Sequence, residues 1–232
     1  MPATPPERDP RAFFYESFAE EWDARMDRNE IEKRLRLVFS RLLRREDVRG
    51  KRVLDAGAGM GYFSRVLAEW GARLVALDMG PALLGKVRQK CAAQAVAGSA
   101  LDLPFSDHSF DVVLCTEVIE HTTDPRRAVA ELCRVSAPGC LLLLTTPNRL
   151  WRPAVVVATA LRLRPYQGYE NWVGYHQLAA WVGAAGMRVE RQSGFNLLPH
   201  TFFCRPAFDF LDGIGFLHPL MINIALRARR PA

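Results

Sequence analysis

Residues 51–61 read KRVLDAGAGMG, and residues 62–68 continue with YFSRVLA. The apolar pair near the start suits a buried strand, the glycines suit a turn, and the apolar spacing after them suits a helix. This order predicts the entry to a doubly wound α/β sheet. Because glycine has no Cβ and the following helix N-terminus offers N–H groups, a ligand can approach the backbone here.

The spacing of the glycines distinguishes between families of nucleotide-binding turn. Gly57, Gly59 and Gly61 form G-x-G-x-G, with Asp55 two residues ahead. A dinucleotide fingerprint would be G-x-G-x-x-G and a P-loop would end in Gly-Lys-Ser/Thr, and neither is present. An ordinary βα turn also suits the glycines taken alone. The stretch resembles motif I of the class I S-adenosylmethionine (SAM)-dependent methyltransferases, and the resemblance implies that these four residues and Ala56 contact SAM.

Length, composition and charge suit one folded α/β domain. A chain of 232 residues, 49% of them hydrophobic, can bury a large core. The net charge of +6 comes without a long Lys/Arg run or a nucleic-acid-binding module, so we expect no nucleic-acid partner. The charge suits either a solvated basic face or attraction to an acidic substrate, a carrier protein or a peripheral membrane surface.

Cysteine usage indicates a reducing compartment. The five cysteines are widely spaced and include no C-x-x-C pair, which favours reduced core residues over a zinc site or a disulfide frame. The N-terminus lacks a signal sequence, and no apolar run reaches membrane-spanning length. We therefore expect a cytoplasmic protein, either a monomer or a homodimer.

The chain ahead of the glycine turn divides in two. Residues 1–10 contain four prolines and predict a disordered tail, which leaves residues 11–232 as a single domain. Residues 11–45 show an amphipathic helical pattern. This helical segment either packs on the sheet or forms a lid over the cofactor.

Part of this helical segment is similar to the helix that precedes motif I in many small-molecule methyltransferases. The similar part contains Tyr15 and Trp22, and the resemblance implies that both close over SAM. Related enzymes also send an arginine from this region to the SAM carboxylate. Here that residue is Arg34 or Arg36.

An acidic residue ends the second predicted strand. Residues 74–77 are apolar and Asp78 follows them. A carboxylate at this place can accept hydrogen bonds from both ribose hydroxyls of a nucleoside, in a SAM enzyme or in a nicotinamide enzyme. Met79 comes next and would cover the adenine face.

A third strand near residues 95–100 leads to the expected adenine contact. In the methyltransferases the loop after this strand usually brings an acid to the adenine amine, but Ser99 and Leu101 occupy places often held by acids. We expect the backbone of Ala100 and Leu101 to make the contact, with Asp102 as the alternative.

Residues 101–116, LDLPFSDHSFDVVLCT, resemble the methyltransferase pattern of a Leu-Pro-Phe loop followed by a fourth strand. The strand ends at Thr116, which with Glu117 we count among the SAM contacts. Glu117, Glu120 and His121 resemble the Glu-x-x-Glu-His segment of the ubiquinone-biosynthesis O-methyltransferases. Three interpretations stay open: Glu120 and His121 brace the next helix, His121 acts as a catalytic base with or without Glu120, or all three hold Mg²⁺.

The second half of the chain carries the expected acceptor site. Residues 134–148, RVSAPGCLLLLTTPN, resemble the same family and predict a buried fifth strand. Residues 149–173 correspond to the insertion where these enzymes recognise their acceptor, and the apolar residues 195–220 predict a second cover that would suit a lipid or membrane contact. The pocket candidates are Tyr166, Tyr169, Asn171 and Trp172.

These patterns together predict an α/β fold with a doubly wound, mostly parallel seven-stranded sheet, helices on both faces and an antiparallel last strand. The resemblance implies SAM-dependent O-methylation of a small apolar or aromatic acceptor, such as a natural-product or quinone-like molecule. N- or C-methylation, a nicotinamide-dependent oxidoreductase and a non-catalytic SAM-fold binding protein remain alternatives.

Overall fold

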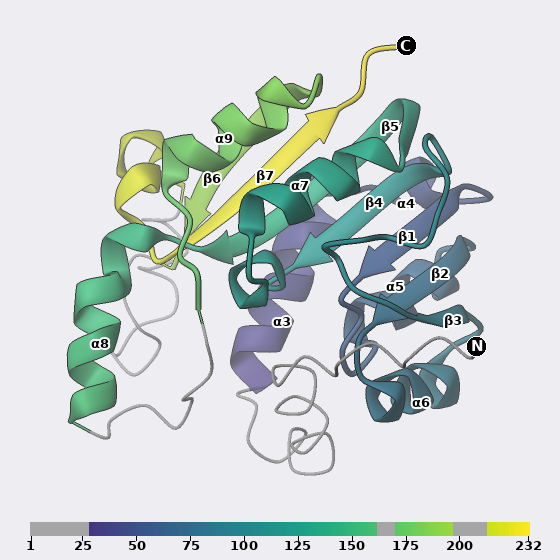
Figure 1. The fold of residues 1–232 in the computed structure, drawn as a ribbon, viewed down its shortest axis with the longest axis horizontal. Helices are drawn as coiled ribbons and strands as arrows, with labels where there is room; N and C mark the ends of the chain where they lie inside the picture. The colour runs from purple at the N-terminus through teal and green to yellow at the C-terminus, as the bar shows by residue number, and fades with distance from the viewer. Residues whose placement is uncertain (1–27, 162–169, 197–212) are drawn as a thin grey trace, which may run out of the picture.

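The computed structural model describes residues 28–161, 170–196 and 213–232, and within them seven strands hydrogen-bond into one sheet (Figure 1). The strands are β1 (Arg52–Ala56), β2 (Arg73–Asp78), β3 (Gln94–Ala97), β4 (Phe110–Thr116), β5 (Ser136–Pro147), β6 (Arg188–Phe195) and β7 (Asn223–Arg229).

The order across the sheet is β3-β2-β1-β4-β5-β7-β6. Strands β3 to β5 pair in parallel, and β7 runs antiparallel to β5 and to β6 on its two sides. The strand order reverses between β1 and β4, and the carboxyl ends of such strands border the crevice in which open α/β sheets bind ligands. The expected mostly parallel sheet with an antiparallel last strand is confirmed.

Helices cover both faces of the sheet. The helices are α3 (Arg28–Leu37), its π-helical continuation η1 (Val38–Leu42), α4 (Arg45–Val48), α5 (Tyr62–Glu69), α6 (Pro81–Lys90), α7 (Pro125–Arg134), α8 (Arg152–Ala160) and α9 (Tyr175–Ala184). Short 3₁₀ turns complete the set: η2 (Ile119–His121), η3 (Arg149–Trp151) and η4 (Gly215–Leu220).

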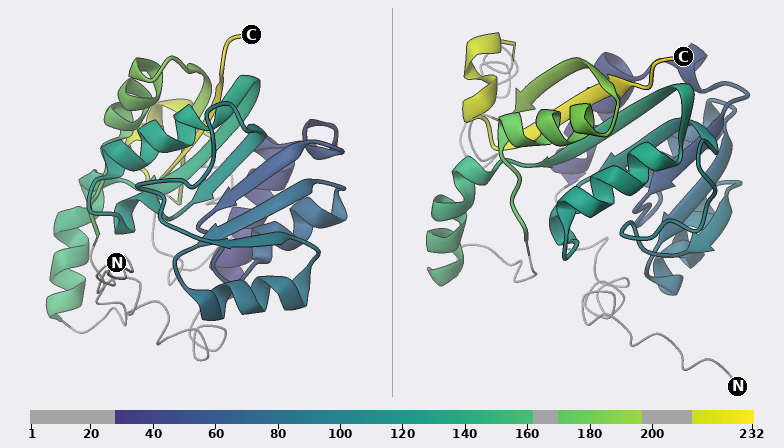
Figure 2. Two further views of the ribbon diagram at one scale, coloured as in Figure 1. Left: turned by 45° about the vertical axis from the view of Figure 1, so that its right-hand side comes forward. Right: turned by 45° about the horizontal axis from the view of Figure 1, so that its top comes forward.

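Two apolar clusters form because neighbouring residues of a strand point to opposite faces. Leu54 belongs to one cluster with Leu132 of α7 and Leu178 of α9. Val53 belongs to the other with Leu67 of α5 and Leu42 of η1. Figure 2 shows α7 and α9 on the same side of the sheet. Burial on both faces explains why the strands read as continuous apolar runs.

Two features of the second half of the chain lie at or beside turns. The Pro-Gly pair at positions 138 and 139, which is typical of a turn, lies inside β5, where Gly139 adopts φ +76 and the pairing with β4 shifts register. The expected acceptor-site insertion at residues 149–173 begins with η3 and continues into α8, which carries exposed Val156 and Val157. The expected tail at residues 1–10 lies outside the described residues. Across the described segments, no helix combines the length and apolar character that a membrane crossing requires.

Candidate cofactor and active site

The glycine turn is packed against the protein on one side and open on the other. The N–H groups of Gly57 and Ala58 both donate to the carbonyl of Leu77, at 2.7 and 2.9 Å. Gly57 has φ +80, and a Cβ placed there would lie 2.2 Å from a methyl carbon of Val118. Gly59 also has positive φ, but a Cβ placed there would meet no atom of the described residues within 4 Å. The open side therefore lies at Gly59.

Asp78, at the end of β2, faces this turn. One of its carboxylate oxygens accepts the Gly59 N–H at 2.8 Å, and the other accepts the Gly80 N–H at 2.9 Å. Burial raises the pKa of Asp78, while these backbone bonds oppose the rise. A carboxylate offers about four acceptor positions, so Asp78 keeps acceptor capacity beyond its bonds to the backbone. The chemistry of the carboxylate and the open face at Gly59 fit the ribose of a nucleoside and its attached base.

Asp55 is buried at the end of β1 and anchors the next helix. The Ser64 hydroxyl on α5 donates to its carboxylate at 2.5 Å. Burial raises the pKa of Asp55 to about 6, helped by the charge of Asp78 and opposed by the bond from Ser64. Because the Asp55 side chain is only 1% exposed, its visible contact is with α5.

The loop after β3 lies beside Asp78. The N–H of Gly98 donates to the Asp78 carbonyl at 3.0 Å. Further along, the Leu101 N–H donates to the Ser99 hydroxyl at 3.1 Å. Met79 is 39% exposed, whereas Ala100 is buried. The segment predicted to contact adenine is thus at the same sheet edge as the glycine turn, but the Leu101 N–H is engaged by Ser99.

Glu117 links the end of β4 to two distant elements. It adopts φ +54, which is uncommon for a residue with a side chain. Its carboxylate accepts the Asn223 side-chain amide at 3.1 Å and lies 3.5 Å from the Arg34 guanidinium on α3. Arg36 is exposed and bonds to the carbonyl of Glu32 on its own helix. Of the two candidate arginines, Arg34 is the one beside this sheet edge.

Glu120 and His121 lie together in η2. Glu120 is 1% exposed and accepts the Thr146 hydroxyl at 3.0 Å. Its other carboxylate oxygen is 3.7 Å from Nε2 of His121, which is 22% exposed. Burial, and then the charge of Glu117, raise the pKa of Glu120 well above its ordinary value. The site thus combines a buried carboxyl with a histidine that solvent can reach.

The hypothesis that Glu117, Glu120 and His121 hold Mg²⁺ is not supported. No group of three or more His, Cys, Asp or Glu side chains in the described parts of the chain is arranged to hold a metal ion. The reason is that the Glu117 carboxylate interacts with Arg34 and Asn223, while Glu120 accepts the hydroxyl of Thr146.

The expected acceptor residues are only partly within the described chain. Asn171 is exposed, and its side-chain amide donates to the carbonyl of Thr122 at 2.6 Å. Its backbone N–H donates to the Glu120 carbonyl at 2.6 Å, so Asn171 braces η2. Trp172 is half-buried. The other acceptor candidates, Tyr166 and Tyr169, lie outside the described residues, as does most of the expected cover at residues 195–220. The two residues expected to close over SAM, Tyr15 and Trp22, also lie outside them.

Sequence reasoning missed several partners of the candidate residues. Ser64, Thr146 and Asn223 bond to Asp55, Glu120 and Glu117, respectively. Thr146 was visible only as part of a threonine pair at the end of a buried strand, and Asn223 carried no local signal.

Comparisons with known proteins agree with this geometry. Residues 54–144 match a family model described as a methyltransferase domain. The chain is 31% identical over 191 residues to the ubiquinone biosynthesis O-methyltransferase of Hahella chejuensis. The aligned region covers 77% of this chain and 80% of that protein. It is 40% identical over 98 residues to the malonyl-[acyl-carrier protein] O-methyltransferase of Serratia marcescens, 42% of this chain and 38% of that protein.

A solved structure shares the fold. The magnesium protoporphyrin IX methyltransferase of Synechocystis, solved with bound SAH, superposes with a TM-score of 0.66 at 16% identity, covering 95% of this chain and 97% of that one.

Proposed function

This chain belongs to the class I SAM-dependent methyltransferases, and from that premise we propose that it methylates an oxygen atom of a small, largely apolar acceptor. The observation that carries the proposal is the pairing of buried Glu120 with partly exposed His121, 3.7 Å apart, in the turn just after β4. A hydroxyl acceptor must lose its proton during transfer, and a histidine is the side chain best suited to take it near neutral pH.

The residues at the carboxyl ends of β1 and β2 would hold the cofactor. Asp78 would accept the ribose hydroxyls, because its carboxylate already faces the open side of the turn at Gly59. Met79 would cover the adenine face, and the loop that contains Ala100, Leu101 and Asp102 would meet its edge. When bound, SAM supplies a methyl group on a positively charged sulfur, which an aligned nucleophile can displace.

The elements around β4 would hold the amino-acid end of the cofactor. Arg34 would bind its carboxylate, and Thr116 and Glu117 would line the same edge. Glu117 already lies 3.5 Å from the Arg34 guanidinium. Tyr15 and Trp22 are proposed to close over the cofactor from the N-terminal segment.

His121 would remove the acceptor proton while Glu120 holds the imidazole. The acceptor proton would go to the ring nitrogen, and Glu120, once ionised, would stabilise the positive charge that the imidazole gains, because its carboxylate lies 3.7 Å from Nε2; that charge would oppose the burial that raises the pKa of Glu120. The Thr146 hydroxyl and the Asn171 N–H fix the side chain and carbonyl of Glu120. Transfer requires the acceptor oxygen to lie roughly 3–3.5 Å from the methyl carbon, in line with the bond that breaks.

An apolar acceptor, presented free, by a carrier protein or from a membrane, is supported by the surface of α8 and η4. The exposed large apolar side chains on and beside these elements are Leu150, Val156, Val157, Leu161, Phe216 and Leu220. The indole N–H of Trp151, the last residue of η3 before α8, donates to the Leu220 carbonyl at 2.8 Å and so ties the start of α8 to η4. Tyr166, Tyr169 and Trp172 are proposed to complete the acceptor pocket.

Calorimetric titration tests the cofactor site. We expect wild-type protein to bind SAM and its demethylated product S-adenosylhomocysteine (SAH), and to show no competition by NADH. Asp78→Ala should weaken SAM binding by about 1–3 kcal/mol, the usual effect of losing hydrogen bonds to a charged group. Asp111→Asn is the control, because Asp111 pairs with Arg52 near the start of β1. Absence of binding at millimolar SAM would overturn the cofactor assignment.

Labelled SAM tests the reaction. Incubation with cell extract, followed by identification of the labelled product, should give a methyl ether or ester of a small apolar molecule. A methyl group on nitrogen or carbon would replace the oxygen assignment, and SAM binding without turnover on any extract would point to a non-catalytic protein.

A further inference from the structure

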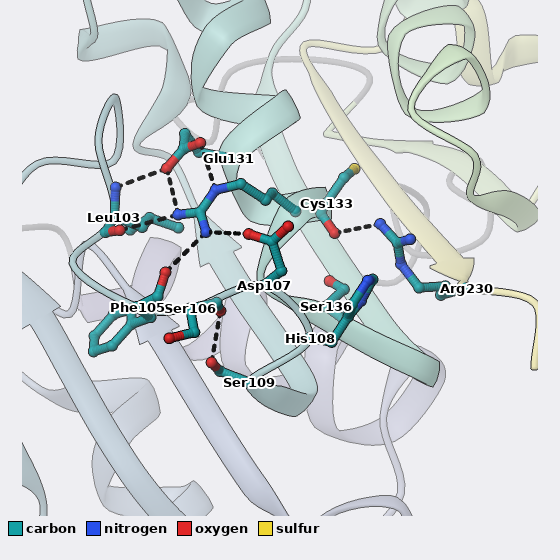
Figure 3. Close-up of polar contacts among 11 residues, drawn as sticks. Leu103, Phe105, Ser106, Asp107, His108, Ser109, Glu131, Cys133, Ser136 and Arg230 are labelled. Atoms are coloured by element: carbon teal, nitrogen blue, oxygen red, sulfur yellow. Dashed lines mark hydrogen bonds and ion pairs between the residues drawn. The ribbon is translucent and has the colours of Figure 1, made fainter.

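Arg134, the last residue of α7, holds the loop that follows the predicted adenine contact. Its guanidinium bonds to the carbonyls of Leu103 and Phe105, at 3.0 and 2.8 Å (Figure 3). It also donates to the carboxylate of Asp107 at 2.8 Å. Two further bonds, both 2.8 Å, join it to the two oxygens of Glu131, one turn earlier on α7.

These contacts use the full donor capacity of the side chain. An arginine has five N–H donors in a fixed plane, and Arg134 makes five hydrogen bonds, one from Nε and two from each terminal nitrogen. Glu131 adds a further bond, because its carboxylate accepts the Leu103 N–H at 2.9 Å. Leu103 is therefore held at both its N–H and its carbonyl by this pair.

The loop is anchored at a second point on the other side of the adenine segment. The Gly98 N–H donates to the Asp78 carbonyl, and a Cβ at Gly98 would lie 3.4 Å from the Pro104 ring, so the loop folds back on itself. Residues 99–102 thus span the distance between an anchor on β2 and an anchor on α7. Their position relative to Asp78 depends on both.

Stability alone is a weak explanation for so many bonds at this place. Arg134 is 30% exposed and Asp107 is 66% exposed, and ion pairs at such exposure contribute little to folding. Three of the six bonds instead go to backbone groups of Leu103 and Phe105. What this arrangement determines is the path of the loop.

We propose that Arg134 and Glu131 are positioning residues that set residues 99–102 against the base of the bound cofactor and so give the site its preference for adenine. This inference rests on the proposed cofactor site. Neither residue touches the cofactor, and both act through the loop. A lysine at position 134 keeps the charge but offers one nitrogen in place of a planar fork, so it cannot hold Glu131 and two carbonyls together.

The test compares two ligands that differ only in the base. Wild-type protein and the variants Arg134→Lys, Glu131→Gln and Asp107→Asn are titrated with SAH and with S-inosylhomocysteine, in which an oxo group replaces the adenine amine. Arg126→Lys, an exposed residue of the same helix, is the matched control. Thermal unfolding of each variant identifies any that has lost its fold.

We expect Arg134→Lys and Glu131→Gln to raise the Kd for SAH by about tenfold, a typical effect of losing hydrogen bonds that order a binding loop. The Kd for the inosine analogue should change by less than about twofold, because that ligand already lacks the adenine amine. Asp107→Asn retains the other partners and should have a smaller effect on SAH. If Arg134→Lys or Glu131→Gln does not fold, Asp107→Asn still tests the proposal, because it removes only one of the bonds to Arg134.

Two results would overturn the inference. In the first, folded variants bind SAH as tightly as wild type does. In the second, they lose affinity equally for both ligands, which indicates general damage to the site and not the loss of a specific contact with the base. The proposed function fails in a different way, since wild-type protein itself would then not bind SAH.

Discussion

The hydroxyl of Ser64 donates to the carboxylate of Asp55 across the glycine turn, at 2.5 Å, and both side chains are buried. The bond ties the first turn of α5 to the end of β1, so it fixes the start of the helix whose N-terminus faces the candidate site. It also leaves a buried acid close to Asp78, whose charge raises the pKa of Asp55 further. The two aspartates therefore differ in role, one anchoring a helix and the other facing the open side of the turn.

Stability should fall with rising pH because of Asp55. Its pKa is about 6 in the folded protein against an ordinary value of 3.8, so the folded state binds a proton that the unfolded state has already released. Its contribution is present below about pH 4 and is lost as the pH rises to about 6. The difference of about two units between the two pKa values corresponds to at most about 3 kcal/mol in the free energy of unfolding.

Asp55→Asn isolates this effect in urea unfolding curves recorded at several pH values. Relative to the variant, wild-type protein should lose free energy of unfolding between pH 4 and 6 and stay level above that. Asp111→Asn provides a control of opposite sign, because Arg52 lowers the pKa of Asp111. An energy difference between wild type and Asp55→Asn that is constant with pH would contradict the assignment.

Gly57 and Gly59 should respond differently to alanine. Gly57→Ala places a Cβ 2.2 Å from Val118 at φ +80, so we expect a large loss of stability. Gly59→Ala meets no atom within 4 Å in the part of the chain that the structure describes, and it should lose only about 1–2 kcal/mol from its positive φ. Its Cβ would instead enter the open space beside Asp78 and should weaken SAM binding more than tenfold, roughly the effect of 1.4 kcal/mol.

Thermal unfolding and titration with SAM, performed on both variants, separate the two outcomes. The expected order of stability is wild type, Gly59→Ala, then Gly57→Ala. A folded Gly59→Ala variant that binds SAM as wild type does would show that the cofactor lies elsewhere.

Arg34 should matter for the carboxylate of the cofactor, and Arg36 should not. Arg34 lies beside Glu117 at the sheet edge, whereas Arg36 is exposed on the same helix. We expect Arg34→Ala to weaken SAH binding by about 1.5–3 kcal/mol, the range for hydrogen bonds to charged groups. Binding of 5′-methylthioadenosine, which has no carboxylate, should be unchanged.

Arg36→Ala is the matched control for this prediction, since it removes the same side chain from α3. Equal losses of affinity for SAH and 5′-methylthioadenosine in Arg34→Ala would assign Arg34 to packing of the helix instead.

Most of the fold could be predicted because its signals are local. The glycine turn, the apolar runs and the Leu-Pro-Phe loop each identify an element within about ten residues, and the family resemblance orders them. The start of β5 could not be predicted in this way. Pro138 and Gly139 indicate a turn, and they lie where the pairing with β4 shifts register, between Ser136 opposite Phe110 and Leu141 opposite Val112, so the turn residues form an irregularity inside a longer strand.

The sequence predicted which strand ends meet at the candidate site, but not which side chains contact one another there. Arg34 and Arg36 are two residues apart and so point about 200° apart around a helix, and the sequence does not say which face meets the sheet. Contacts such as Asn223 with Glu117 join residues 106 positions apart. The Mg²⁺ hypothesis was not supported because the carboxylates of Glu117 and Glu120 interact with side chains that lie far away in the sequence.

His121 and Glu120 should act as one unit in catalysis. With the acceptor identified by labelling, His121→Ala should lower kcat by about 10²–10⁴, the usual contribution of a general base, and leave SAH binding unchanged. The rise in rate with pH that reports loss of the histidine proton should disappear. Free imidazole added to the variant should restore part of the rate if the pocket admits it.

Glu120→Gln keeps the size of the side chain and an acceptor for the Thr146 hydroxyl, but it removes the titrating group beside His121. Because Glu120 is buried and acts through the imidazole, its loss should lower kcat less than loss of His121 does. Once His121 is gone, Glu120 has nothing left to orient, so the double variant should be no slower than His121→Ala alone. If the fold decrease in kcat of the double variant equals the product of the two single decreases, the two residues contribute independently. If His121→Ala instead keeps the wild-type kcat and pH profile, His121 is not the catalytic base. The acceptor would then be one that reacts without losing a proton to the protein.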